Sequence, residues 1–226
     1  MQAILKTVQS RKLVTLGVTL LFWVPVIVCS LLLVYNTIPY FSFSRNFTFL
    51  QERGVLYAKT IWRWSFYLHI AAGSLCILTA LLQFSSWILK KRSAIHVISG
   101  KIYVFVVLLI GAPSGFYMTF FAKGGVGERL CFMMMAVFWF YSTYKGFTAA
   151  AMERNFVSHK NWMIRSYAMA LTAVTFRIYH IVFLLAGLGA FDNYAISLWI
   201  SVLGNAALAE LLIARRSRNY LQTLKS

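Results

Sequence analysis

Hydrophobic residues dominate the chain in long runs, which shorter polar and basic segments interrupt. Six of these runs reach the roughly 20 residues that a helix needs to cross a bilayer. They lie at Leu13–Tyr35, Ser65–Leu89, Val97–Phe121, Glu128–Ala151, Asn161–Ala186 and Tyr194–Ala214. Because lipid offers the backbone no hydrogen-bond partners, and porin-like alternation is absent, we expect helices. The pattern predicts an all-α integral membrane protein, with residues 1–226 forming a single six-transmembrane-helix bundle.

The composition favours the same class of protein. Of the 226 residues, 60% are hydrophobic and only 12% are charged, and the mean hydropathy is +0.71. A soluble domain of this size needs more charge to cover its surface. Lys6, Arg11 and Lys12 precede the first run as in a signal peptide. However, that run exceeds the usual length of about 7–15 residues and lacks a small-residue cleavage site, so we expect a retained helix.

Basic residues gather in the connections on one side of the expected bundle. They are Lys90, Lys91, Arg92, Arg154, Lys160, Arg165, Arg215, Arg216 and Arg218. Since Lys and Arg are enriched in cytoplasmic connections, we expect both termini in the cytoplasm and a multi-pass protein of the inner membrane. The longest connection, residues 36–64, then lies outside. Its many aromatic residues suit docking of a partner subunit or contact with the membrane surface.

The net charge of +17 has an explanation in this topology. Most basic residues border helix ends, where anionic lipid headgroups meet them. Membrane lipids are therefore the expected partners, and nucleic acid is not.

Two of the four histidines share a local pattern. "YLHIAAGSL" at 67–75 places His69 four residues before Gly73, and "AIHVISGKI" at 94–102 places His96 four residues before Gly100. A small residue one turn after a histidine leaves space on the face where the imidazole projects. That space suits close helix packing or a flat prosthetic group, and both interpretations stay open.

The histidines also sort into two pairs by depth. His69 and His180 fall in the outer halves of their spans, and His96 and His159 fall at the inner ends. Heme iron takes axial imidazoles from opposite sides, so each pair is a candidate to hold one heme b. The alternative is that the imidazoles form polar contacts between helices or line a polar cavity.

Arg177 is the most costly residue at its predicted depth. It lies three residues before His180 on nearly the same helix face. A guanidinium in that position needs an anion, a carbonyl or water, or it extends to the outer headgroups. A heme propionate, a lipid phosphate and an anionic substrate all fit.

The acidic residues exclude several alternatives. All lie in connections or near span ends, at Glu52, Glu128, Glu153, Asp192 and Glu210. A proton-coupled carrier needs a carboxylate or equivalent relay near mid-membrane, and a catalytic zinc site needs three close ligands. A lipid-modifying hydrolase or transferase lacks support from a carboxylate or a serine–histidine pair.

Three segments carry a resemblance to a known family. "LHIAAGSLCILTALLQF" at 68–84, "HVISGKIYV" at 96–104 and "SHKNWMIRSYAMALTAVTFRI" at 158–178 resemble bacterial membrane proteins of the domain of unknown function 2306. The resemblance covers roughly residues 60–185 and implies no established activity. Members often have arginine after the second histidine, where this chain has Val97. The matching positions are His69, Gln83, His96, Gly100, His159, Trp162, Arg165 and Arg177.

Two functions follow as expectations. The first is a diheme b-type cytochrome that carries electrons across or within the membrane, with a quinone or a soluble electron donor as partner. Enzymatic activity as a transmembrane oxidoreductase stays open. The architecture is similar to that of ascorbate-linked diheme cytochromes, by analogy alone. The second is a non-enzymatic membrane carrier, or an accessory subunit of a larger complex, with an anion or lipid site at Arg177.

Overall fold

The computed structural model describes residues 2–223, and every regular element in this range is helical. The long helices are α1 (Gln2–Thr37), α4 (Thr60–Gln83), α6 (Ser93–Val106), α8 (Val126–Ala151), α9 (Phe156–Leu185) and α10 (Ala190–Thr223). The short elements are η1 (Ile38–Ser42), α2 (Thr48–Gln51), α3 (Gly54–Ala58), α5 (Ser86–Lys91), η2 (Val107–Gly111) and α7 (Ala112–Thr119).

Five helical segments in this range are long and apolar enough to cross a membrane. They are Trp23–Ser42, Thr60–Gln83, Ser93–Thr119, Phe156–Leu185 and Ala190–Arg218. The sixth expected span, Glu128–Ala151, lies in α8, which is helical but not among the five. Its charged residues Arg129 and Lys145 and its tyrosines and tryptophan lower its hydropathy. The chain is therefore a helical, multi-pass membrane protein.

The second and third runs contain breaks that the hydrophobic pattern hides. The run Ser65–Leu89 is not one helix, because α4 ends at Gln83 and Ser85 caps the separate helix α5. The Ser85 hydroxyl accepts the Ile88 N–H at 3.3 Å, a common way for a helix to start. The third run changes to a π-helical turn at Val107–Gly111, just before Pro113. Proline lacks the N–H that would bond the carbonyl four residues earlier, which favours a local change of winding.

The connection 36–64 is more ordered than a loop. It contains η1, α2, α3 and the first turn of α4, packed on a buried aromatic cluster. Trp62 and Phe66 lie almost parallel at the centre of this cluster, with ring centroids 5.7 Å apart.

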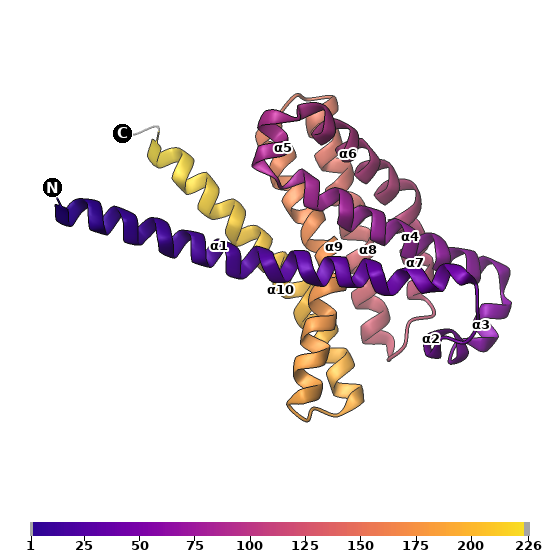
Figure 1. The fold of residues 1–226 in the computed structure, drawn as a ribbon. Helices are drawn as coiled ribbons and strands as arrows, with labels where there is room; N and C mark the ends of the chain where they lie inside the picture. The colour runs from indigo at the N-terminus through magenta and orange to yellow at the C-terminus, as the bar shows by residue number, and fades with distance from the viewer. Residues whose placement is uncertain (1, 224–226) are drawn as a thin grey trace.

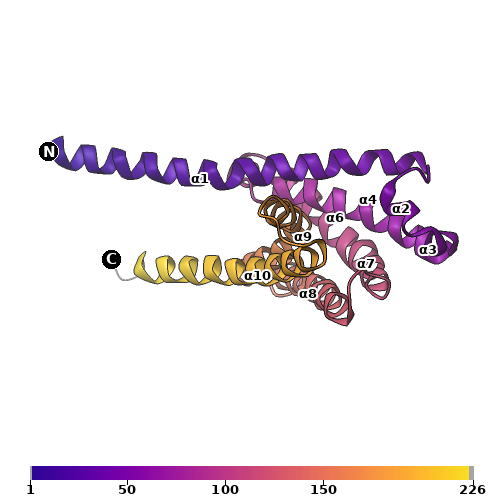
Figure 2. The same ribbon diagram turned by 90° about the horizontal axis from the view of Figure 1, so that it is seen from below.

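The helices converge at one end of the bundle and diverge at the other. The end of α4, α5, the start of α6 and the α8–α9 connection all reach the top of Figure 1, and we call this end of the molecule the convergent end. From there α4 and α9 run apart, one toward the right and one downward. Both chain ends lie on the same side of the molecule in Figures 1 and 2.

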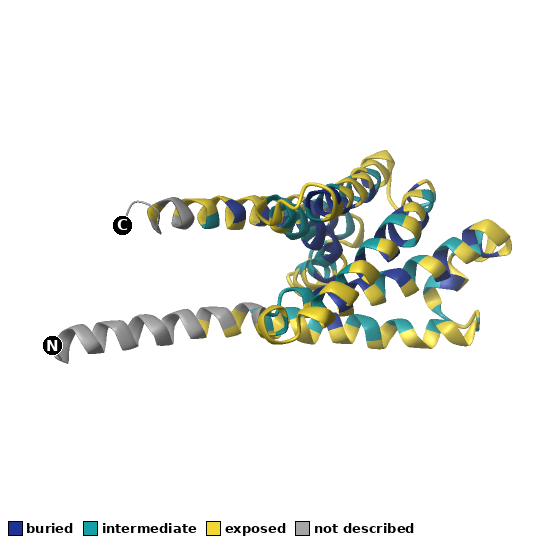
Figure 3. Ribbon diagram, turned by 90° about the horizontal axis from the view of Figure 1, so that it is seen from above, coloured by how far each residue is buried: buried dark blue, intermediate teal, exposed yellow. Residues whose placement is uncertain are grey.

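Burial follows this arrangement. Figure 3 shows buried residues on the facing sides of the packed helices and exposed residues along the outer sides. The main core cluster joins α4, α6, α8 and α9, and includes Cys76, Tyr103, Trp139 and Tyr167. Large apolar side chains such as Leu21 and Leu109 are exposed on the outside, as expected for faces that contact lipid.

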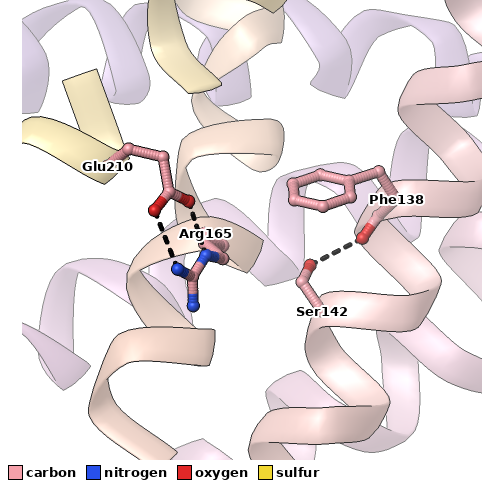
Figure 4. Close-up of polar contacts among 4 residues, drawn as sticks. All are labelled: Phe138, Ser142, Arg165 and Glu210. Carbon is pink, nitrogen blue, oxygen red and sulfur yellow. Dashed lines mark hydrogen bonds and ion pairs between the residues drawn. The ribbon is translucent and has the colours of Figure 1, made fainter. Parts of the chain in front are cut away.

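An ion pair joins α9 to α10. Arg165 donates from Nε to Glu210 Oε1 at 2.6 Å and from Nη2 to Oε2 at 2.8 Å (Figure 4). The guanidinium also lies 4.6 Å from the centroid of the Trp162 ring. Arg165 thus contacts a ring of its own helix and a carboxylate of the next helix. Nearby on α8, Ser142 donates to the Phe138 carbonyl of its own helix.

Removing this ion pair should have a measurable but small effect. We expect Glu210→Gln to lower the free energy of unfolding by about 0.5–1 kcal/mol, because a two-point guanidinium–carboxylate contact exceeds an ordinary surface pair. SDS titration in mixed micelles measures this difference. Glu153→Gln is the matched control, since Glu153 is exposed and has no ion pair among the described residues. Equal losses in the two variants would contradict a stabilising role for the pair.

Candidate functional site

His69 contacts the π-helical turn of the neighbouring segment. Its Nδ1 lies 3.0 Å from the Gly111 carbonyl oxygen. The ring lies against Gly115 of α7, where a Cβ atom would approach His69 Cε1 to 2.7 Å. A carbonyl can only accept a hydrogen bond, so Nδ1 carries the hydrogen and Nε2 carries the lone pair.

His159 repeats this arrangement between α8 and α9. Its Nδ1 lies 2.8 Å from the carbonyl oxygen of Gly146. Gly146 also allows close helix packing, because a Cβ atom there would lie 2.6 Å from Met163 Sδ. By the same reasoning as for His69, the lone pair of His159 is on Nε2. An imidazole held in this way can bind a metal or accept a proton at Nε2.

His96 joins His159 at the convergent end. His96 Nδ1 is buried without a hydrogen-bond partner. Gln83 of α4 fastens this end of α6, because its Nε2 donates to the His96 carbonyl at 2.7 Å and to Ser99 Oγ at 2.6 Å. His96 and His159 both lie in the first turn of their helices, and their pairing on one heme stays a prediction.

The glycine after His96 has a packing role. A Cβ atom at Gly100 would lie 3.2 Å from Gln83 Oε1, so the Gln83 side chain already fills the space that the sequence suggested for a cofactor. The space beside Gly73 is open, because no atom lies within 4 Å of a Cβ atom built there.

The outer histidines contact different helices. His180 stacks on Phe176, with ring centroids 5.7 Å apart, and its carbonyl accepts the Asn193 side chain from α10 at 3.0 Å. Its Nδ1 is buried without a hydrogen-bond partner. His69 instead packs on α7, and α4 and α9 diverge beyond the convergent end (Figure 1). The pairing of His69 with His180 stays a prediction.

Arg177 satisfies part of its hydrogen-bonding capacity within α9. Its Nη1 donates to the Ala173 carbonyl at 2.6 Å, and the residue is exposed. An anion site at Arg177 also stays a prediction.

Sequence reasoning missed the glycines that receive the imidazoles. Gly111 and Gly115 stand in "GAPSG" at 111–115, a small-residue spacing of four around a proline. Such spacing is typical of close approach between membrane helices, and proline often accompanies a changed winding. The spacing in this segment therefore indicates that Gly111 and Gly115 can approach a neighbouring helix closely. Residues 2–223 contain no group of three or more His, Cys, Asp or Glu side chains able to hold a metal ion.

Apolar helices with buried polar contacts between them define a multi-pass helical membrane protein. The profile of a family described as "Predicted membrane protein (DUF2306)" matches residues 66–213, and the chain belongs to this family. No curated protein and no solved structure gave a significant match.

Proposed function

We propose that this chain is a b-type cytochrome in which His96 and His159 are the axial ligands of an inner heme b. The hydrogen bond from His159 Nδ1 to the Gly146 carbonyl carries the proposal, because it leaves Nε2 free as a ligand. Metal-bound histidines usually donate their other ring N–H to a carbonyl or carboxylate in this way. The unpaired, buried Nδ1 of His96 adds a second polar group that lacks a protein partner.

An outer heme is the second part of the proposal. His69 and His180 would hold it, with Arg177 beside its propionates. Support comes from the His69 contact with Gly111, the open space beside Gly73 and the unpaired Nδ1 of His180. When bound, heme supplies reversible one-electron transfer, and a quinone or soluble donor is the proposed electron source. Because α4 and α9 diverge, the inner heme has more support than the outer heme.

The proposal includes a topology in the inner membrane. α8 would be the sixth span, and both termini would lie in the cytoplasm. At 1.5 Å per residue, the 26 residues of α8 reach about 39 Å, enough to cross the hydrocarbon core. The position of both chain ends on one side of the molecule supports an even number of spans.

Heme content tests the inner site directly. We expect protein purified from heme-replete cells to be red, and His159→Asn to contain one heme fewer per chain by pyridine hemochrome analysis. Asparagine keeps an N–H near the position of Nδ1 but cannot replace Nε2 as a ligand. The control Lys160→Gln changes the next residue and should keep the wild-type heme content. A colourless wild-type preparation would overturn the proposal.

A second candidate function is a non-enzymatic carrier or an accessory subunit of a larger complex. The Gln83 side chain favours it, because it fills the space beside Gly100 without any cofactor. In that case the histidines form hydrogen bonds between helices, as His159 and Gly146 do. Colourless wild-type protein with His159→Asn of near-wild-type stability is the result that this candidate predicts.

A further inference from the structure

A pocket lies where the segment before α4 folds back on the start of that helix. Its volume is about 320 Å³, and it is partly open to the outside. Three lining residues come from the segment before α4 and three from α4 itself. They are Phe43, Arg45 and Tyr57, followed by Arg63, Trp64 and Tyr67. None of the residues proposed for heme lies in this set.

The side chains of Arg45 and Arg63 line this pocket, and no carboxylate does. The Arg45 guanidinium lies 4.9 Å and the Arg63 guanidinium 5.6 Å from the centroid of the same Tyr57 ring. None of the chain's five acidic residues lines the pocket. In the described part of the chain the ion pairs are Lys123–Glu52 and Arg165–Glu210, so neither pocket arginine has an acidic partner. An anion in the pocket would offset this unpaired positive charge.

The remaining walls are aromatic and well fixed. Tyr57 and Tyr67 are buried, and their hydroxyl oxygens are hydrogen-bonded at 3.1 Å. Phe43 and Trp64 expose their rings at the mouth, where the organic part of a ligand can lie against them. A tryptophan near the end of a membrane-spanning helix is typical of the headgroup region of a bilayer.

We propose that this pocket binds a phosphate group, held by the guanidiniums of Arg45 and Arg63. The planar guanidinium matches two phosphate oxygens at once, which favours arginine over lysine at such sites. The phosphate can belong to a phospholipid headgroup or to a soluble phosphate compound, since both present the same oxygens. This site does not depend on heme binding.

Binding measurements on the full chain test the pocket. In detergent solution, calorimetry with inorganic phosphate probes the soluble source, and native mass spectrometry with phosphatidylglycerol and phosphatidylcholine probes the lipid source. We expect at least one of these probes to bind the wild type, and Arg45→Gln with Arg63→Gln to weaken that binding about tenfold or more. Retention of lipid alone assigns the site to a headgroup, and binding of inorganic phosphate assigns it to a soluble compound.

Two controls distinguish specific binding in this pocket from general attraction of anions to a positively charged protein. Lys59→Gln removes a charge from the same segment, but its ammonium lies over the Phe121 ring, 5.9 Å from its centroid, outside the pocket. It should change the affinity less than about twofold, because exposed charges act weakly at a distance. Arg45→Lys with Arg63→Lys keeps the net charge but loses the guanidinium fork, so affinity should still fall. The proposal is overturned if no probe binds, if Lys59→Gln weakens binding as much as the arginine variants, or if the lysine variant binds like the wild type.

Discussion

Alanine at Gly115 is expected to lower the free energy of unfolding by about 1–3 kcal/mol, the usual cost of overfilling a packed site. Its Cβ atom would lie 2.7 Å from Cε1 and 2.9 Å from Nδ1 of His69. The imidazole can retreat only by giving up the 3.0 Å hydrogen bond to the Gly111 carbonyl. The added atom therefore costs packing and a buried polar contact together. SDS titration of the purified protein measures the loss.

Gly73→Ala is the matched control for this prediction. Gly73 stands one helical turn after His69 in the sequence, yet a Cβ atom there has nothing within 4 Å. Because alanine favours helix over glycine, this change should stabilise α4 by up to about 1 kcal/mol. A Gly73→Ala loss as large as that of Gly115→Ala would mean that the sequence neighbour, and not α7, receives the imidazole.

The hydrophobic runs were enough to predict the helical membrane fold. Runs of sufficient length in a chain with 12% charged residues have few alternatives, because lipid demands internally bonded backbones. The breaks were harder to predict. Ser85 lies inside an otherwise apolar stretch, and only its side-chain contact with the Ile88 N–H shows that a second helix begins there. The capping signal of one serine is weak beside a long hydrophobic run.

The sequence placed His96 and His159 at the ends of their helices correctly, because each follows a short polar connection. His96 follows the basic segment 90–92, and His159 follows the connection after α8. The contacts around them were not predictable. Gln83 reaches His96 and Gly100 from another helix, and the pairing depends on how α4 crosses α6. Periodicity gives the direction of a side chain on its own helix, but not the angle between two helices.

The pairing of His69 with His180 rests on depth along the chain alone, and it stays a prediction. Equal depth along two helices brings side chains together only when the helices are nearly parallel. His69 and His180 were matched by depth, whereas α4 and α9 diverge beyond the convergent end. The crossing angle depends on small residues such as Gly111 and Gly146, which set how closely the helices approach. A single sequence does not reveal which glycines meet which helix.

Alanine at Tyr103 should have the largest effect on stability, a loss of about 3–5 kcal/mol, as for other large buried side chains. Tyr103 is 1% exposed and joins α6 to both α8 and α9. Its hydroxyl lies 2.8 Å from Ser166 Oγ and accepts the Trp139 Nε1–H at 3.1 Å. Ser166 Oγ in turn lies 2.6 Å from Thr143 Oγ1, which donates to the Trp139 carbonyl at 2.7 Å.

The donor and the acceptor of each hydrogen bond in this network can be assigned by starting from the Trp139 carbonyl. The Trp139 carbonyl can only accept, so Thr143 uses its hydrogen there and must accept from Ser166. Ser166 then accepts from Tyr103, whose oxygen receives the Trp139 N–H. Every hydroxyl hydrogen is used once, and the chain of bonds begins and ends at Trp139. Losing Tyr103 thus leaves the buried Trp139 N–H without an acceptor and Ser166 Oγ without a donor.

Two further variants separate the hydroxyl from the ring. Tyr103→Phe keeps the ring and should cost about 1–2 kcal/mol, because it removes one buried polar link between helices. Phe105→Ala removes a ring of similar size from the same helix, but Phe105 is 59% exposed, so its loss should stay below about 1 kcal/mol. Unfolding in SDS measures all three. If Tyr103→Ala and Phe105→Ala lowered stability equally, the buried network would not hold α6 against α8 and α9.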